Sequence, residues 1–202
     1  MKEETQKKLK EIKQSFRFLM NGVASQSMRD KGLEYHINWG VSLPHLIEMA
    51  NEYGKDYELA VELWKEDIRE CKILAALIMP HDQMPMELVD IWIEQTKSQE
   101  IVEMTSSFLY QYLSYASVLA YQWIASDVPL RQLCGFLIIG KLFANGQEPN
   151  ERGINEFLDQ VKATVQDGGL PEKHAAINSL YRFCELGEEY EGIAKKAFPG
   201  FV

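Results

Sequence analysis

The chain has 202 residues, a formal net charge of −9 at pH 7 and a hydrophobic fraction of 46%. This composition is ordinary for a globular protein, and it excludes a disordered chain, a collagen-like repeat and a disulfide-stabilised miniprotein. A chain of this length buries roughly 70% of its unfolded surface, so we expect a single domain over residues 1–202. The three cysteines, Cys71, Cys134 and Cys184, lack C-x-x-C spacing and fit reduced thiols of a cytoplasmic protein.

The N-terminal segment is charged and polar, and no stretch reaches the ~18 apolar residues that a membrane span requires. We therefore expect a cytoplasmic protein with no membrane contact. The 30 acidic residues outnumber the 21 basic residues. Nucleic-acid-binding proteins normally carry a basic footprint, so this charge balance argues against a broad DNA-binding surface and leaves room only for a local one.

Apolar residues recur at three- and four-residue steps along most of the chain, which predicts amphipathic helices. The first helix is expected over residues 3–20 and ends at Asn21-Gly22. A short helix follows from Ser27 to Lys31, and Ser42, Asp56 and Asp67 are the expected N-caps of the next three helices. Further helices are expected over residues 85–96, 99–112, 114–125, 128–144, 151–166, 171–185 and 188–197.

Two segments resemble each other. Leu63-Trp64 is followed by Asp67 and an apolar run to Ile78, and Gln122-Trp123 is followed by Asp127 and an apolar run to Ile139. Each segment predicts a helix that ends in tryptophan, an Asp cap and a second helix. With no convincing strand pattern, we predict an all-α fold of HEAT-like helical repeats that form a curved α-solenoid. A compact helical bundle is the alternative.

Four stretches carry a resemblance to a known family. They are Ser27-Met28-Arg29, the turn Gly40-Val41-Ser42-x-Pro44, the run from Glu62-Leu63-Trp64 to Arg69-Glu70, and the segment 122–127, QWIASD. Together they resemble the DNA alkylation repair family, typified by AlkD-like alkylpurine DNA glycosylases. The resemblance implies a basic concave face that holds duplex DNA, and hydrolysis of the N-glycosidic bond of N3- or N7-alkylated purines without a metal. A carboxylate and two tryptophans lie near the deoxyribose, and an arginine holds the DNA backbone.

The resemblance places the family's catalytic carboxylate at Glu103 and one tryptophan at Gln99, within the segment Thr96-Lys97-Ser98-Gln99-Glu100-Ile101-Val102-Glu103. A glutamate can stabilise a cationic sugar, although its extra methylene moves the charge. The family arginine aligns with Leu133, two residues beyond Arg131, and the second tryptophan aligns near Asn178. The alternative for Glu103 is a solvated helix-surface glutamate.

Arg69, Lys72 and Arg131 are the candidate DNA-backbone contacts, because each lies early in the second helix of a predicted pair. The alternative is a surface charge, or an arginine paired with Glu70 or Asp127. The basic N-terminal run KKLKEIKQSFR allows either phosphate contacts or a solvated helix face. Trp64, Trp92 and Trp123 are predicted core residues, as is Trp39, although Trp39 lies in a loop.

No cofactor and no metal are predicted, because the four histidines are scattered and no P-loop, G-x-G-x-x-G or G-x-S-x-G motif occurs. Two functional hypotheses remain. The first is a divergent member of the DNA alkylation repair family whose base excision from duplex DNA is weak or lost. The second is a non-catalytic helical-repeat module that binds a protein partner or a special DNA structure.

Overall fold

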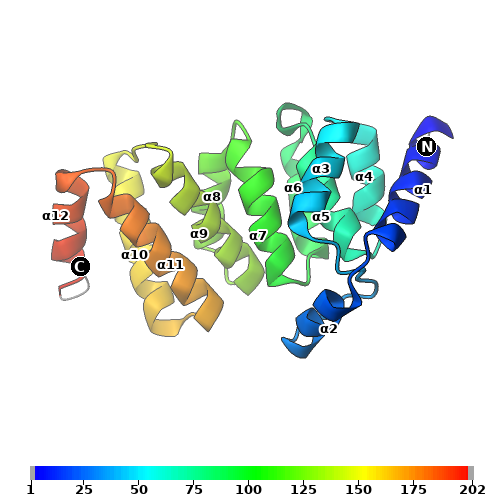
Figure 1. The fold of residues 1–202 in the computed structure, drawn as a ribbon. Coiled ribbons are helices and arrows are strands. Elements are labelled where there is room, and N and C mark those ends of the chain that lie inside the picture. The colour runs from blue at the N-terminus through cyan, green and yellow to red at the C-terminus, as the bar shows by residue number, and fades with distance from the viewer. Residues whose placement is uncertain (1–2, 200–202) are drawn as a thin grey trace. The chain divides into compact units, whose positions relative to one another are not determined.

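In the computed structural model, residues 3–199 are described, and all regular elements among them are helical (Figure 1). Ile37 and Ile68 pair as in parallel strands, but only as an isolated bridge. The chain divides into two compact units, Met1–Leu109 and Tyr110–Val202. The predicted all-α class is therefore confirmed for the described residues, whereas the single domain over residues 1–202 stays a prediction.

The first unit contains seven α-helices and one 3-10 helix among its described residues. They are α1 (Glu3–Phe18), α2 (Gly22–Asp30), α3 (Leu43–Tyr53), α4 (Tyr57–Lys65), α5 (Arg69–Ile78), η1 (His81–Gln83), α6 (Met86–Gln95) and α7 (Gln99–Phe108). Helix α5 packs against α4, α3 and α7, and α1 packs against α4. Helix α5 is thus the central element of this unit.

The second unit is built from helices that pack against the next helix, or the next but one, along the chain. Its elements are η2 (Tyr110–Tyr112), α8 (Ala116–Ile124), α9 (Pro129–Ala144), α10 (Glu151–Asp167), α11 (Leu170–Cys184) and α12 (Glu188–Ala197). Helix α9 packs against α8 and α11, and α11 also packs against α10 and α12. The two segments that echo each other in the sequence therefore form the paired helices α4/α5 and α8/α9.

Aromatic side chains fill both cores. In the first unit Trp64 and Trp92 stack with parallel rings whose centroids are 4.0 Å apart. In the second unit Phe143, Phe157 and Phe183 contact one another at centroid distances of 5.1–5.6 Å. Trp123 is also buried, which confirms three of the four predicted core tryptophans, and Trp39 is half-buried.

Several helix boundaries differ from the sequence predictions, most of them by one or two residues. The helix expected over Ser27–Lys31 begins at Gly22, because the side chain of Asn21 accepts a hydrogen bond from the Ala24 backbone and caps it. Asp67 is not the cap of α5, since Ile68 occupies that position. The helix expected over residues 99–112 ends at Phe108, and a 3-10 turn follows it. Among residues 3–199, no helix has the length and apolar character needed to cross a bilayer.

Candidate functional site

The predicted catalytic carboxylate lies on α7. Glu103 is half-buried, and its Oε1 accepts a hydrogen bond of 2.8 Å from Nε2 of Gln99, one helical turn earlier. The structure thus brings together the two residues that the sequence assigned to this part of the site. An amide stands where the resemblance places a tryptophan. It orients the carboxylate, but it offers no aromatic face to a sugar cation.

Arg69 lies at the first position of α5 and is only 4% exposed. Its Nη2 is 2.6 Å from Oε1 of Glu100, and its Nε is 2.9 Å from Oε2 of the same carboxylate. This two-pronged contact is the geometry in which arginine binds carboxylates most strongly. The prediction that Arg69 lines a DNA-facing groove conflicts with this burial. Arg69 instead joins α5 to α7.

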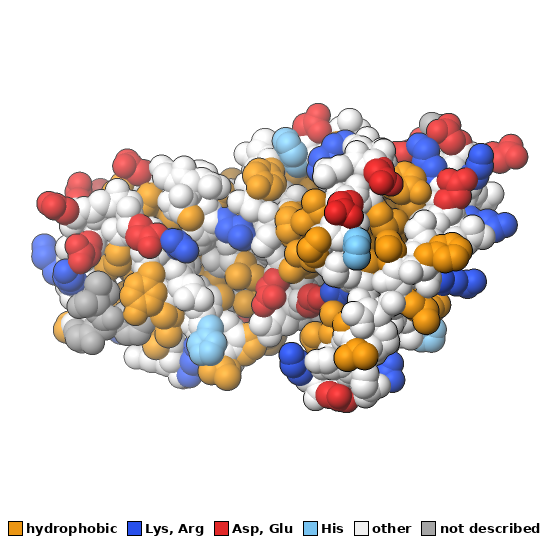
Figure 2. All heavy atoms as spheres, in the orientation of Figure 1, with side chains coloured by type: hydrophobic (Ala, Val, Ile, Leu, Met, Phe, Trp, Pro, Cys, Tyr) orange, Lys and Arg blue, Asp and Glu red, His pale blue; other side chains and the backbone are white. Residues whose placement is uncertain are grey.

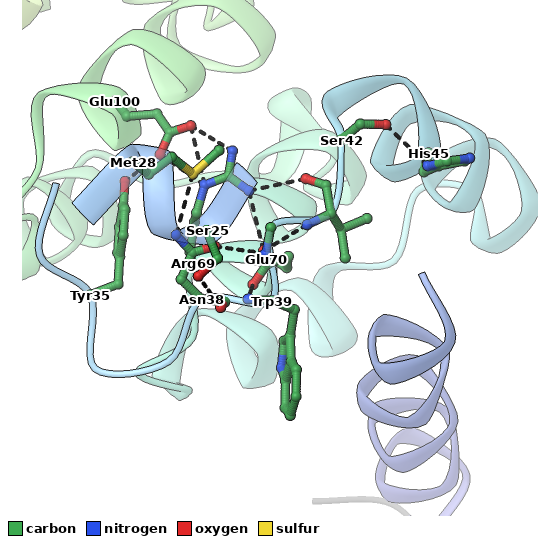
Figure 3. Close-up of polar contacts among 12 residues, drawn as sticks. Ser25, Met28, Tyr35, Asn38, Trp39, Ser42, His45, Arg69, Glu70 and Glu100 are labelled. Atoms are coloured by element: carbon green, nitrogen blue, oxygen red, sulfur yellow. Dashed lines mark hydrogen bonds and ion pairs between the residues drawn. The ribbon is translucent and has the colours of Figure 1, made fainter. Parts of the chain in front are cut away.

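Glu70, the next residue, is fully buried. Its carboxylate accepts hydrogen bonds of 3.2 Å from the backbone N–H groups of Trp39 and Val41, and it lies 3.2 Å from Nη1 of Arg69 (Figure 3). The pair between Arg69 and Glu70, one of the alternatives that the sequence allows, therefore exists. Together the two side chains fix the loop between α2 and α3 onto α5.

Tyr35 completes this network from the loop. Its hydroxyl donates to Oε2 of Glu100 at 2.5 Å and lies 2.7 Å from the hydroxyl of Ser98. Burial raises the pKa of Tyr35, and the bond to Glu100 raises it further. Burial would also raise the pKa of Glu100, but the hydrogen bonds from Arg69 and Tyr35 outweigh it and lower that pKa. Glu100 is therefore a charged structural group.

Lys72 occupies a different environment on α5. Its ammonium lies 4.6 Å from the centroid of the Trp64 ring and donates a hydrogen bond to the Trp64 carbonyl oxygen. Burial lowers the pKa of Lys72, and the nearby Lys97 lowers it further. This side chain lies at the edge of a pocket, above the stacked pair Trp64–Trp92.

The pocket has a volume of about 660 Å³ and lies among helix ends of the first unit. Three lysines line it, Lys65 from the end of α4, Lys72 from α5 and Lys97 from the link before α7. His36 contributes a further basic group, and Glu34 and Asp67 are the acidic residues in its lining. Helices α5 and α7 both begin beside it, so their positive ends face the same region. We name this feature the lysine pocket.

The last candidate contact with the DNA backbone, Arg131, lies in the second unit. Arg131 is half-buried on α9, and Leu133, where the family arginine aligns, is 2% exposed. A buried leucine forms part of the core and holds no phosphate. The position near the second family tryptophan, Asn178, lies exposed on α11. Neither aligned position therefore carries the side chain that the resemblance would require.

Four residues of this region have no functional role among the sequence predictions: Tyr35, Glu100, Lys65 and Lys97. The signal for the lysines was available, because each flanks the end of a predicted helix. The signal for Tyr35 and Glu100 was not, since these two partners lie 65 residues apart in the chain.

Comparison with known proteins supplies the family. A family model described as DNA alkylation repair enzyme matches residues 5–180. No curated protein matches the chain. Among solved structures, one described as a new family of proteins related to the HEAT-like repeat DNA glycosylases, with affinity for branched DNA structures, is similar with a TM-score of 0.84. It shares 20% identity, and the match covers 94% of this chain and 81% of that one. The likeness confirms the HEAT-like helical-repeat fold, and the family match identifies the chain as a member of the DNA alkylation repair enzyme family.

Proposed function

We propose that this protein binds DNA, that it favours branched over linear duplexes, and that its excision of alkylated purines is weak or lost. The observation that carries the DNA-binding part is the lysine pocket, which three lysine residues line in a chain of net charge −9. Phosphate contacts supply most non-specific affinity for DNA. The preference for branches is supported by the likeness in fold to a protein that is described by its affinity for branched DNA.

Loss of excision is supported by the side chains at the aligned positions. Gln99 takes the place of one tryptophan and hydrogen-bonds Glu103, and a buried leucine takes the place of the arginine. Excision of a cationic purine requires stabilisation of positive charge that develops on the sugar. Glu103 alone supplies a carboxylate for that purpose, without the aromatic face and the phosphate clamp that the family resemblance implies.

DNA binding is tested by fluorescence anisotropy with a four-way junction and a linear duplex of equal strand length. We expect tighter binding to the junction, and weaker binding of Lys72→Gln and Lys97→Gln to both DNAs. Each variant should also lower the slope of log affinity against log salt by about 1. Lys162→Gln, an exposed lysine on α10, is the matched control and should bind as the wild type does. If the wild type binds neither DNA at low salt, the proposal fails and a protein partner becomes the better hypothesis.

Excision is tested by release of 7-methylguanine from duplex DNA under single-turnover conditions, with Glu103→Gln alongside. We expect release close to the spontaneous rate for both proteins. Release that is well above this rate in the wild type and is abolished by Glu103→Gln would show a working glycosylase. Such a result would overturn the proposed loss of excision, while leaving DNA binding intact.

A further inference from the structure

A second surface of the first unit combines cationic and exposed apolar side chains. Along α1, a shallow groove of about 280 Å³ is lined by Lys10, Lys13 and Arg17. Their spacing of three and four residues places them on one helix face, about 4.5 Å and 6 Å apart along the axis. Lys13 also bonds Glu66 at 2.8 Å, whereas Lys10 and Arg17 are exposed.

Directly after this basic face, three apolar side chains project into solvent. Phe18 is 89% exposed, Met20 is 60% exposed and Val23 is 82% exposed. Figure 2 shows apolar side chains on the surface over α2 and the end of α1, beside lysine and arginine side chains. Isolated exposed apolar residues are ordinary, but three of them within six positions beside a row of cations are not.

The backbone that carries these side chains is held in place. The Leu19 N–H donates to the Ser15 carbonyl at 3.1 Å, and the Asn21 N–H donates to the Trp39 carbonyl at 2.8 Å. The Asn21 side chain caps α2. The Arg17 guanidinium lies 5.8 Å from the centroid of the Trp39 ring. Fraying therefore does not account for the exposure of Phe18 and Met20, because they lie on an ordered connection.

The same loop joins this surface to the lysine pocket. Glu34, Tyr35 and His36 line the pocket, and Trp39, three residues later, receives the bond from Asn21. The ion pair between Lys13 and Glu66 also brings α1 to the corner between α4 and α5, next to the pocket residue Asp67. The lysine pocket and the groove on α1 are therefore connected through this loop and this ion pair within the same unit.

We propose that α1 and the α1–α2 connection form a branch-point site, in which Lys10 and Arg17 contact DNA phosphates and Phe18 stacks on an unstacked base. The proposal rests on the proposed function. A linear duplex keeps its bases stacked, whereas a branch point leaves base faces open to an aromatic ring. Apolar side chains such as Phe and Met are the ones that DNA-binding proteins insert at disrupted base steps. The positive charges of Lys10 and Arg17 beside Phe18 favour a negatively charged polymer as the ligand of this surface.

The first test is Phe18→Ala in anisotropy titrations with a four-way junction and a matched linear duplex. We expect junction affinity to fall about tenfold and linear affinity to change less than about twofold, because a linear duplex offers open base faces only at its ends. Phe18→Trp should keep the junction preference. Leu170→Ala, which truncates a 68% exposed side chain on α11, should change neither affinity. At 89% exposure, truncation of Phe18 leaves the core intact.

In a second experiment, the fluorescent base 2-aminopurine stands at the branch point of the junction. Its fluorescence emission reports whether the base is stacked. Wild-type binding should change this emission, and Phe18→Ala at saturation should not. For the phosphates, Lys10→Gln and Arg17→Gln should each lower the salt slope by about 1 on both DNAs. Lys7 also lies on α1 but does not line the groove, so Lys7→Gln should leave the salt slope unchanged.

The outcomes separate this inference from the proposed function. If the wild type prefers the junction and Phe18→Ala keeps that preference, the branch-point site is overturned and the proposed function stands. Equal losses on both DNAs would make Phe18 a general contact, which also overturns the stacking role. If the wild type binds neither DNA, both proposals fall. Binding to phosphatidylserine vesicles that depends on Phe18, without DNA binding, would assign this surface to a membrane instead.

Discussion

At the scale of single residues, the buried pair between Arg69 and Glu100 has a large expected effect on stability. Arg69 is 4% exposed and Glu70 is fully buried, so removal of the guanidinium leaves two carboxylates without their shared cation. We expect Arg69→Met to lower the free energy of unfolding by about 3–5 kcal/mol. Urea denaturation followed by circular dichroism measures this loss.

The control for this prediction is Lys65→Met. Its ammonium pairs with Glu62 at 2.6 Å, but the side chain is 62% exposed, so we expect a loss below about 1 kcal/mol. Equal effects of the two substitutions would mean that the buried network contributes no more than a surface ion pair. That result would contradict the structural role of Arg69 as the link between α5 and α7.

Acid titration of the same network gives a second prediction. The pKa of Glu100 is lowered from 4.5, because the bonds from Arg69 and Tyr35 outweigh the opposing effect of burial. The unfolded state therefore binds the proton first as the pH falls. The stabilisation is complete above the unfolded pKa and is lost as the pH falls through the lower folded pKa.

We therefore expect the difference in unfolding free energy between wild type and Glu100→Gln to be large near about pH 7 and to shrink towards about pH 3. Urea midpoints at the two pH values measure it. Glu48 is an exposed glutamate on α3. Glu48→Gln should therefore differ little from the wild type in unfolding free energy at either pH. A difference for Glu100→Gln that does not change with pH would exclude an ionised Glu100 as the source of stability.

At the scale of elements, Gly40 determines how α2 docks. Its φ is +71°, and a Cβ at this position would lie 2.2 Å from the Asn21 carbonyl oxygen. We expect Gly40→Ala to combine backbone strain with a clash that separates the α2–α3 loop from the start of α2. Hydrogen exchange should rise over residues 21–41.

Gly54 provides the control without a clash. Its φ is +69° and its ψ is −168°, a conformation that other residues rarely adopt, yet nothing lies within 4 Å of a Cβ built there. Gly54→Ala therefore isolates the backbone strain, about 1–3 kcal/mol. Gly40→Ala should cost clearly more. If the two alanine variants lose the same stability, the contact with Asn21 is not what holds α2.

Local sequence signals predicted most elements, and they failed where two signals competed. Asp56 was predicted as a cap, and its side chain does accept the Leu59 N–H. Asn21-Gly22 was interpreted as a helix stop, but the same asparagine also caps the next helix, so α2 begins earlier than predicted. The cap at Asp67 failed because Ile68 takes that position, and its neighbour Arg69 donates its N–H to Ile37 in a distant loop.

The candidate site was harder to predict than the elements. The i, i+4 spacing of Gln99 and Glu103 is local, and the structure brings these two side chains together. The burial of Arg69 depends on Glu100 from α7 and on the Val41 carbonyl from the loop between α2 and α3, and these contacts form only after both segments have packed against α5. The helical period does not show whether the first residue of α5 is buried. Because arginine side chains are mostly exposed, the sequence predicts a surface position for Arg69.

At the scale of the whole molecule, the proposed DNA contacts in the lysine pocket and on α1 belong to the first unit, Met1–Leu109. The second unit, Tyr110–Val202, has its own aromatic core around Phe157. The prediction of one domain requires that the two units unfold together. In repeat folds, such cooperation arises from interfaces between neighbouring helices.

Phe157→Ala tests this cooperation. The side chain is fully buried, with ring centroids of Phe143 and Phe183 at 5.1 and 5.4 Å, so truncation should cost about 3–5 kcal/mol. If the chain is one cooperative domain, hydrogen exchange monitored by mass spectrometry will rise over the slowest-exchanging helices of both units. Val118→Ala truncates a side chain on α8 that is 55% exposed. This variant should raise hydrogen exchange in neither unit. An increase confined to residues 110–202 would contradict the single domain, and would make the first unit the independent carrier of the proposed DNA contacts.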